Sequence, residues 1–363
     1  MTPSVPTARR SNTLSSSLGL GEKLFASSDE RRLAKAIDSG LDEVEAGLLT
    51  QMSFTDHLAD VTSRYLLDAG GKRIRPVLAL LTAQLGTGNN ANVIQAAEAI
   101  EMTHLASLYH DDVMDEAQMR RGVPSAQTVW GNSVAILTGD LLFARASKLV
   151  AGMGERAILL QAATFERLCL GQLHETIGPQ AGEDPIEHYL QVLADKTGSL
   201  IATAAQVGLM FSDAPEEYVQ PVVTFGEKIG VAFQLIDDVI DLAPMVDETG
   251  KTPGTDLRAG VATLPLLYLR RLAATDESAA ALLRRIDNDL NMGIGVDEQV
   301  DEDASIDLNA AIAELREHVV TKETLDEAHR WAADAVAALA PLPDGPVKNA
   351  LTRFADTVVD RSN

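Results

Sequence analysis

Apolar residues recur with the period of an α-helix along almost the whole chain after residue 28, and this repeat constrains the fold most strongly. Glycine and proline clusters separate the helical stretches, and no segment alternates like a half-buried strand. We therefore predict an all-α protein built as a single large helical bundle. The predicted helices span residues 29–50, 55–69, 75–86, 91–118, 125–151, 155–177, 186–209, 215–243, 263–273, 276–289, 304–319, 322–340 and 346–361.

Charge and cysteine content narrow the function classes. The 363 residues include 53 acidic side chains and 30 Lys or Arg, a formal charge of −23 that disfavours nucleic acid or an anionic membrane surface as partner. One cysteine, Cys169, excludes an intramolecular disulfide and a cysteine-based zinc site, and fits a reducing cytoplasm. Residues 1–28 lack the apolar stretch of a signal peptide, so we interpret them as a flexible leader to a domain at 29–363. No apolar run approaches the roughly 18 residues that span a bilayer.

The segment 287–307 is rich in acidic residues, glycines and polar residues. We predict a charged loop between two helices there. A calcium or partner site is the less favoured alternative.

Two aspartate clusters lie within otherwise apolar helices, as Asp111-Asp112-Val113-Met114-Asp115 and Asp237-Asp238-Val239-Ile240-Asp241. At about 100° per residue, the first and last aspartates of each cluster share one helix face. Carboxylates stacked in this way repel one another unless a cation offsets them. Oxygen ligands suit Mg²⁺, which commonly binds one or two carboxylates together with substrate phosphates. A single cluster could be a solvated acidic face, but two with the same spacing predict helices that clamp a diphosphate through metal ions.

Basic residues that could neutralise a diphosphate occur near these clusters despite the acidic total. Three of them stand at the start of a predicted helix, where free backbone N–H groups also favour anions. Each alone could be a surface charge. The candidates are Lys72, Arg73, Arg75, Arg120, Arg121, Lys196 and Lys251.

Taken together, these motifs resemble the ordered signature of the trans-isoprenyl diphosphate synthase family, particularly the long-chain polyprenyl diphosphate synthases of actinobacteria. The resemblance extends along nearly the whole chain from about residue 30. Any single motif is weakly specific, whereas the complete set in this order is very specific. The matching segments are 70–76, 104–115, 120–122, 171–175, 196–197, 233–241, 250–257 and 263–265.

The resemblance implies a bundle of the isoprenoid synthase type with a central apolar cavity. It implies a cytoplasmic homodimer that contacts membranes only transiently for product release and binds about three Mg²⁺ ions per active site. The implied reaction condenses isopentenyl diphosphate successively, head to tail, onto an allylic diphosphate primer. The product is a long all-trans-polyprenyl diphosphate, a precursor of a quinone side chain such as that of menaquinone.

The resemblance also assigns roles to individual residues. The catalytic aspartates are Asp111, Asp112, Asp115, Asp237, Asp238 and Asp241, and all of them except Asp238 are implied metal ligands. The implied contacts of isopentenyl diphosphate are Lys72, Arg75, His104 and Arg121. The implied contacts of the allylic diphosphate are Arg120, Lys196 and Lys251, with Thr197 and Gln234 nearby. His104 lies seven positions before Asp111 and therefore on the same helix face, within about 20°.

The chain departs from the family pattern at one position. Many relatives have a lysine in a Gly-Lys-x-Thr-Leu-Pro sequence, whereas this chain has Val261 between Gly260 and Ala262. One phosphate-binding cation is therefore missing at this position.

Product length is expected to depend on Ala106 and Ser107, two small residues about one turn before the first aspartate cluster. A growing chain can pass small side chains, so we predict a product on the order of seven to ten isoprene units, each about one helix turn long. Two alternatives remain open. One is a terpene cyclase of the same fold, and the other is a non-catalytic regulatory subunit of a heteromeric synthase.

Overall fold

A computed structural model describes residues 27–243, 253–293 and 302–362 of this protein. Residues 1–26 of the leader predicted at 1–28 lie outside the described residues, as does Lys251 with its predicted phosphate contact. The chain forms two compact units. Unit 1 contains Met1–Leu168, Ser199–Glu227 and Val336–Thr357, and unit 2 contains Cys169–Gly198, Lys228–Ala335 and Val358–Asn363. One helical domain over residues 29–363 stays a prediction.

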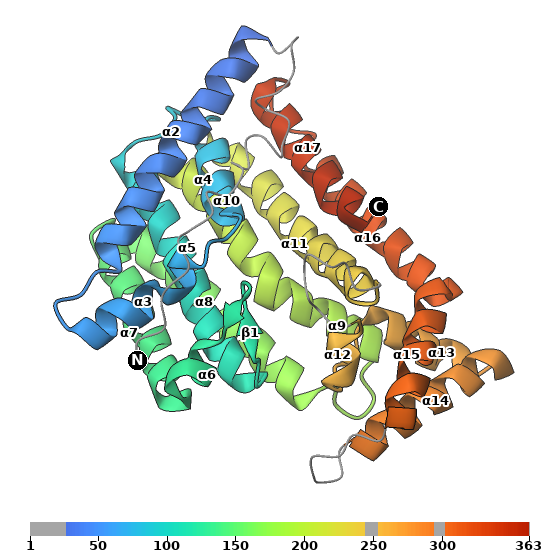
Figure 1. The fold of residues 1–363 in the computed structure, drawn as a ribbon. Helices are drawn as coiled ribbons and strands as arrows, with labels where there is room; N and C mark the ends of the chain where they lie inside the picture. Colours follow the sequence, from blue (N-terminus) through green and yellow to red (C-terminus); the bar gives the residue numbers. More distant parts are fainter. Residues whose placement is uncertain (1–26, 244–252, 294–301, 363) are drawn as a thin grey trace. The chain divides into compact units, whose positions relative to one another are not determined.

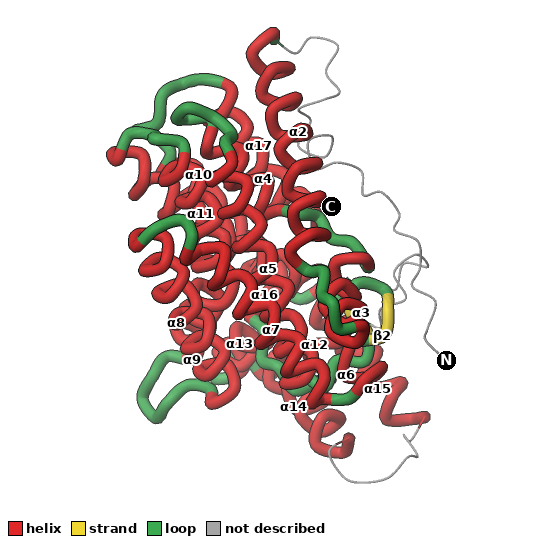
Figure 2. The backbone as a smooth tube through the Cα atoms, turned by 90° about the vertical axis from the view of Figure 1, so that its left-hand side faces the viewer, coloured by secondary structure: helices red, strands yellow, loops and turns green. Residues whose placement is uncertain are grey.

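Helices make up nearly all of the described chain (Figures 1 and 2), which confirms the all-α prediction. The first helices are α2 (Ser28–Gln51), α3 (His57–Asp68), α4 (Ile74–Ala83), α5 (Ala91–Met114), α6 (Ala126–Trp130), α7 (Asn132–Ala151), α8 (Glu155–Ile177) and α9 (Pro185–Leu193). They are followed by α10 (Ser199–Phe211), α11 (Val219–Asp241), α12 (Thr255–Arg258), α13 (Leu264–Ala273), α14 (Glu277–Gly293), α15 (Glu302–Glu317), α16 (Val319–Ala338) and α17 (Pro346–Val359). None of these helices is both long and apolar enough to cross a bilayer.

In unit 1, α4 is the most buried helix, with Pro76 to Ala83 all inaccessible to solvent. It lies against α10 and α5 (Figure 1). Gly208 permits this close approach, because a β-carbon there would lie 2.2 Å from the Ala79 carbonyl oxygen. The Thr82 hydroxyl donates to the Ala205 carbonyl across the same contact at 2.7 Å. The helices of unit 1 therefore pack with their backbones nearly touching, which fixes the position of α5.

In unit 2, a π-helical turn, Ala194–Gly198, joins α9 to the start of α10. Gly230 of α11 packs onto it, since a β-carbon at Gly230 would lie 2.6 Å from the Gly198 Cα. Single π-turns often occur at functional sites. This one carries Lys196 and Thr197.

Two short strands, β1 (Met119–Arg120) and β2 (Val123–Pro124), form an antiparallel ladder after the first aspartate cluster (Figure 2). Its two-residue turn consists of Arg121 and Gly122, with φ of 54° and 76°. Positive φ at both central residues is the geometry of a type I′ hairpin turn. The Tyr65 hydroxyl of α3 donates to the Pro124 carbonyl at 2.8 Å and anchors the ladder.

The structure corrects several predicted bounds. The helix predicted at 91–118 ends at Met114, the one predicted at 125–151 is divided at Gly131, and the one predicted at 186–209 contains the π-turn. The acidic segment 287–307 is helical at both ends, because α14 extends to Gly293 and α15 begins at Glu302. Acidic residues near a helix start are favourable to the helix dipole, which fits the early start of α15.

Candidate active site

The first aspartate cluster lies at the end of α5. Asp115 is the C-terminal cap residue of the helix, and its backbone N–H donates to the Asp111 carbonyl at 2.8 Å. Asp112 points elsewhere: it is fully buried and accepts a hydrogen bond from Arg120 Nε at 2.6 Å. Burial raises the pKa of Asp112, although the Arg120 guanidinium acts in the opposite direction. In this structure Asp112 therefore holds Arg120 of the ladder, while Asp111 and Asp115 remain more accessible.

A buried ion-pair network lies behind the predicted cationic site. Arg73 is only 8% exposed and has a left-handed backbone, with φ of 51°. Its guanidinium pairs with Glu45 of α2 at 2.5 Å and with Glu101 of α5 at 3.3 Å. A buried guanidinium that pairs with two carboxylates uses its charge and N–H groups within the protein and not on a ligand. Arg73 therefore supports the loop, whereas the neighbouring Lys72 is exposed.

Arg75, His104 and Arg121 are brought together in unit 1 as predicted. Arg121 donates to the backbone carbonyls of Leu66, at 2.8 Å, and Gly70. Burial lowers the pKa of Arg75 to about 10, and its Nε has no hydrogen-bond partner within the part of the chain that the structure describes. Burial, followed by the charges of Arg75 and Arg121, lowers the pKa of His104 well below 6.5. The site is strongly positive, because two carboxylates, those of Glu45 and Glu101, cannot neutralise the three guanidinium groups of Arg73, Arg75 and Arg121.

In the second cluster, the middle aspartate is again the buried one. Asp238 is 5% exposed and accepts hydrogen bonds from the Tyr189 hydroxyl, at 2.8 and 3.0 Å. It also accepts from the Leu264 backbone N–H at 3.2 Å, which caps the start of α13. Burial raises the pKa of Asp238 to about 8. Asp238 thus joins α9, α11 and α13.

The outer aspartates of this cluster contact other segments of unit 2. Asp241 Oδ2 accepts from the Asp256 N–H at 3.1 Å, and the Asp241 carbonyl accepts from the Gly254 N–H at 2.7 Å. Asp237 Oδ1 lies 3.2 Å from Arg361 Nη2. Asp241 therefore fixes the described part of the motif at 250–257, residues 253–257.

The predicted allylic-site residues of unit 2 lie in or near the π-turn. Lys196 pairs with Glu175 of α8. Gly171 permits this approach, because a β-carbon there would lie 2.9 Å from the Asp195 side chain. Thr197 and Gln234 are half-buried.

Sequence analysis did not assign five partners that position these groups: Glu45, Glu101, Glu175, Tyr189 and Arg361. A signal existed for Glu101, which is a carboxylate in an apolar helix three positions before His104. For the others, long sequence separations concealed the contact.

Comparison with known proteins identifies the family. The polyprenyl synthetase family model matches residues 56–295. The chain is 43% identical over 350 residues to a nonaprenyl diphosphate synthase of Mycobacterium tuberculosis, covering 96% of this chain and 98% of that protein. The chain belongs to the polyprenyl synthetase family.

Other members support the same family assignment. An octaprenyl diphosphate synthase of Haemophilus influenzae is 33% identical, with 91% of this chain and 96% of that protein covered. The crystal structure of a decaprenyl diphosphate synthase from Rhodobacter capsulatus superposes with a TM-score of 0.78, at 34% identity over 92% of this chain and 99% of that one. A geranylgeranyl pyrophosphate synthase from Corynebacterium glutamicum, complexed with calcium and isoprenyl diphosphate, has a TM-score of 0.75 at 40% identity, over 91% of this chain and 98% of that chain. The chain therefore has the all-α isoprenoid synthase fold.

The donor set of this family member fits a hard divalent cation. Its outer aspartates offer carboxylate oxygens, the ligands that Mg²⁺ and Ca²⁺ prefer. Within the described residues, no three His, Cys, Asp or Glu side chains are grouped so that they could hold a metal without help. A substrate phosphate would supply the missing ligands, which is the usual way in which proteins bind Mg²⁺.

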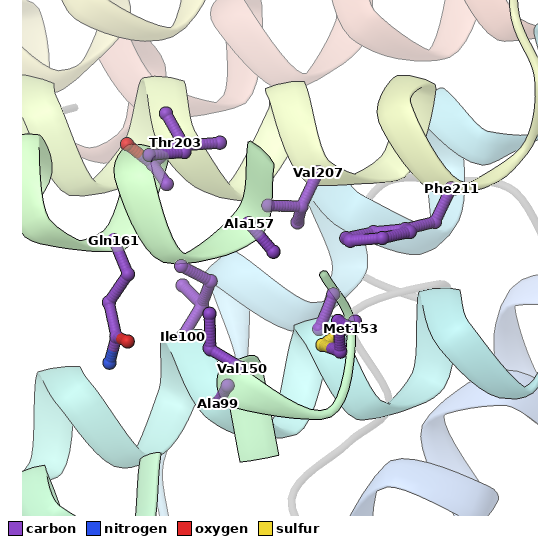
Figure 3. A pocket seen from close by; sticks show the side chains of 11 residues that line it. Ala99, Ile100, Val150, Met153, Ala157, Gln161, Thr203, Val207 and Phe211 are labelled. Carbon is purple, nitrogen blue, oxygen red and sulfur yellow. The ribbon is translucent and has the colours of Figure 1, made fainter. Parts of the chain in front are cut away.

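A small apolar pocket lies in unit 1 beside α5 (Figure 3). Ala96, Ala99 and Ile100 of α5 line it, together with residues of α8, α10 and the segment after α7. Ala106 and Ser107 lie seven positions after Ala99 and Ile100, so each is within about 20° of a lining residue on the helix face. The pocket therefore lies on the α5 face that also presents Ser107 and Asp111.

Proposed function

We propose that this protein is a trans-polyprenyl diphosphate synthase. It adds isopentenyl diphosphate units successively, by head-to-tail 1′–4 condensation, to an allylic diphosphate primer. The observation that carries the proposal is the cluster of Arg75, His104 and Arg121 in unit 1, in which His104 lies on the same helix as Asp111. Guanidinium groups that are only partly neutralised can bind one diphosphate. The nearby carboxylates can bind a second diphosphate through metal ions.

Positioning and charge stabilisation explain catalysis. Lys72, Arg75, His104 and Arg121 hold isopentenyl diphosphate, so that its double bond is placed against the allylic carbon. Arg120, Lys196 and Lys251 stabilise the negative charge that develops on the leaving diphosphate as the allylic C–O bond breaks. The outer aspartates, Asp111, Asp115, Asp237 and Asp241, would hold Mg²⁺, which would supply Lewis-acid stabilisation of that leaving group. No side-chain nucleophile takes part, and the apolar pocket keeps water from the allylic cation.

The direct test is incubation of the purified chain with Mg²⁺, an allylic primer and labelled isopentenyl diphosphate. We expect extractable long-chain product, which chelation by EDTA abolishes. Asp111→Ala and Asp237→Ala should each lower turnover by orders of magnitude, because charge stabilisation of the leaving group is the main catalytic effect. Cyclic hydrocarbon would indicate a terpene cyclase, and no turnover by the chain alone would indicate a regulatory subunit. Near-normal activity of Asp111→Ala would contradict the proposed site.

The proposed product has seven to ten isoprene units. The path from Asp111 past Ser107 to the pocket at Ile100 is about 16 Å along α5, which corresponds to about the first three isoprene units, and the small side chains of Ala106 and Ser107 do not block growth beyond them. Each buried CH₂ contributes about 0.8 kcal/mol, which favours retention of the growing chain. Quinone side-chain synthesis in the cytoplasm is the proposed use.

The proposed assembly is a homodimer. Helix α8 exposes large apolar side chains along its length, and four of them, Leu159, Leu170, Leu173 and Ile177, lie within an arc of about 60° on the helix. Their side chains are 44% to 61% exposed. α7 adds Leu137, which is 66% exposed. An apolar stripe of this kind is typical of an interface.

A further inference from the structure

Arg361 lies against the second aspartate cluster at the far end of the chain. It belongs to the short 3₁₀ turn Asp360–Ser362 that follows α17. Its Nη2 lies 3.2 Å from Asp237 Oδ1, and its guanidinium stacks on the Phe233 ring at 4.5 Å from the centroid. Phe233 and Asp237 are one turn apart on α11, so Arg361 lies along a single face of that helix.

The guanidinium has hydrogen-bonding capacity left. Arg361 Nη1 is buried and has no hydrogen-bond partner among the described residues. A buried N–H without an acceptor is costly, and the cost is larger for a charged group. An anionic oxygen at this position would remove that cost. The donor is thus oriented by Asp237 and Phe233 and still lacks an acceptor.

The missing lysine of the family pattern belongs to the same cluster. Val261 lies in a segment tied to the cluster at both ends, by the Asp256 N–H on Asp241 and the Leu264 N–H on Asp238. Its apolar side chain is 39% exposed and offers no charge to a diphosphate. The cluster therefore lacks a cation from position 261 but receives one from position 361.

We infer that Arg361 is a diphosphate-binding residue that replaces the lysine absent at position 261. In the substrate-free protein it neutralises Asp237. With Asp237 engaged by the metal of a bound metal–diphosphate complex, Arg361 would donate Nη1 to an oxygen of the allylic diphosphate. This inference rests on the proposed function, because it specifies which diphosphate the second cluster holds.

The test measures binding by titration calorimetry, with Mg²⁺ alone and with Mg²⁺ plus inorganic pyrophosphate. Arg361→Gln should bind Mg²⁺ alone a few-fold more tightly, because no cation competes for Asp237, yet bind magnesium pyrophosphate about tenfold more weakly. Arg361→Lys should fall between the two proteins, since it keeps the charge without the planar fork. Val261→Lys in the Arg361→Gln background should restore pyrophosphate affinity to within about threefold of the wild type.

Kinetics provide a second measurement on the same proteins. Arg361→Gln should raise the KM for the allylic primer about tenfold and change the KM for isopentenyl diphosphate less than about twofold. Arg353→Gln is the matched control. Arg353 also lies near the C-terminus, on α17, but pairs with Glu30 at 3.2 Å, so its loss should leave both KM values unchanged.

Unchanged pyrophosphate affinity in Arg361→Gln would overturn the inference, as would equal effects on both KM values. Failure of Val261→Lys to restore affinity would overturn the replacement of the missing lysine. If the wild type binds magnesium pyrophosphate but makes no polyprenyl product, the proposed function fails while the binding result for Arg361 stands.

Discussion

Neighbouring aspartates in each cluster have different surroundings because of helix geometry. Asp112 and Asp238 are rotated about 100° from the first aspartate, which turns them into the protein, where they are 0% and 5% exposed. There Asp112 accepts a hydrogen bond from Arg120, and Asp238 accepts one from Tyr189. The spacing predicted that the outer aspartates share a face. The spacing could not show that the middle aspartate of each cluster connects neighbouring elements, because its hydrogen-bond partners come from other segments of the chain.

At His104, burial has a measurable pH effect. Its pKa is well below 6.5 in the folded protein, whereas in the unfolded chain it is near the ordinary value. As pH falls through about 6.5, the unfolded chain takes up a proton that the folded protein does not, so folding stability decreases. The slope approaches about 1.4 kcal/mol per pH unit for one group.

His104→Gln should lack this component. Urea unfolding at pH 7.5 and pH 5.5 should show a smaller loss of stability on acidification in the variant than in the wild type. His57→Gln, at the exposed start of α3, is the control and should behave like the wild type. Parallel losses in the wild type and His104→Gln would show that His104 is not buried against the guanidinium groups.

Among the helices, the contact of α4 with α10 permits a sharp test. Gly208→Ala would place a methyl group 2.1 Å from the Thr82 hydroxyl and 2.2 Å from the Ala79 carbonyl oxygen. The helices must move apart, and overpacking of this kind typically costs about 1–3 kcal/mol. Gly152→Ala is the control, because its nearest atom is 3.4 Å away, and it should change the free energy of unfolding by less than about 0.5 kcal/mol. Equal denaturation midpoints for both variants would contradict the close contact.

Long amphipathic or apolar helices were predictable from sequence, as α8 shows, whose bounds match the prediction at 155–177. Short elements were not. The ladder at β1 and β2 has two residues per strand, too few for alternation to be detected, although Arg121-Gly122 is a signal for a turn with positive φ. The π-turn at 194–198 keeps helical periodicity on both sides and depends on the Gly198–Gly230 contact. Tertiary packing decided these elements.

The face of α5 that carries Ser107 should control product length. Ser107→Phe and Ala106→Phe should shorten the product to about three or four isoprene units, because an aromatic ring would block the path from Asp111 to the pocket within about two helix turns. The first condensation should remain intact. Gln95→Phe, at an exposed position of α5, should leave the length unchanged. Chromatography measures the product length. Product of native length from both Ser107→Phe and Ala106→Phe would show that the growing chain does not run along this face of α5.

At the scale of the whole molecule, motifs identified the family and supplied the proposed phosphate-binding residues, because each motif is local in sequence. Counterions such as Glu45 and Arg361 were not predictable, since they are 28 and 124 positions from Arg73 and Asp237. The exposed stripe on α8 was also not assigned. α8 exposes more large apolar side chains than α7 does, a difference that helical periodicity alone does not reveal.

The proposed dimer gives the last prediction. Leu159 is 61% exposed on α8, and a glutamate there would place a charge in the centre of an apolar interface, where it has no partner. We expect light scattering to give about twice 38.7 kDa for the wild type at micromolar concentration, and a mass near 38.7 kDa for Leu159→Glu. Val319→Glu is the matched control: Val319 is 52% exposed but lies on α16, so the variant should remain dimeric. A wild-type mass of 38.7 kDa would exclude the dimer, and a dimeric Leu159→Glu would move the interface away from α8.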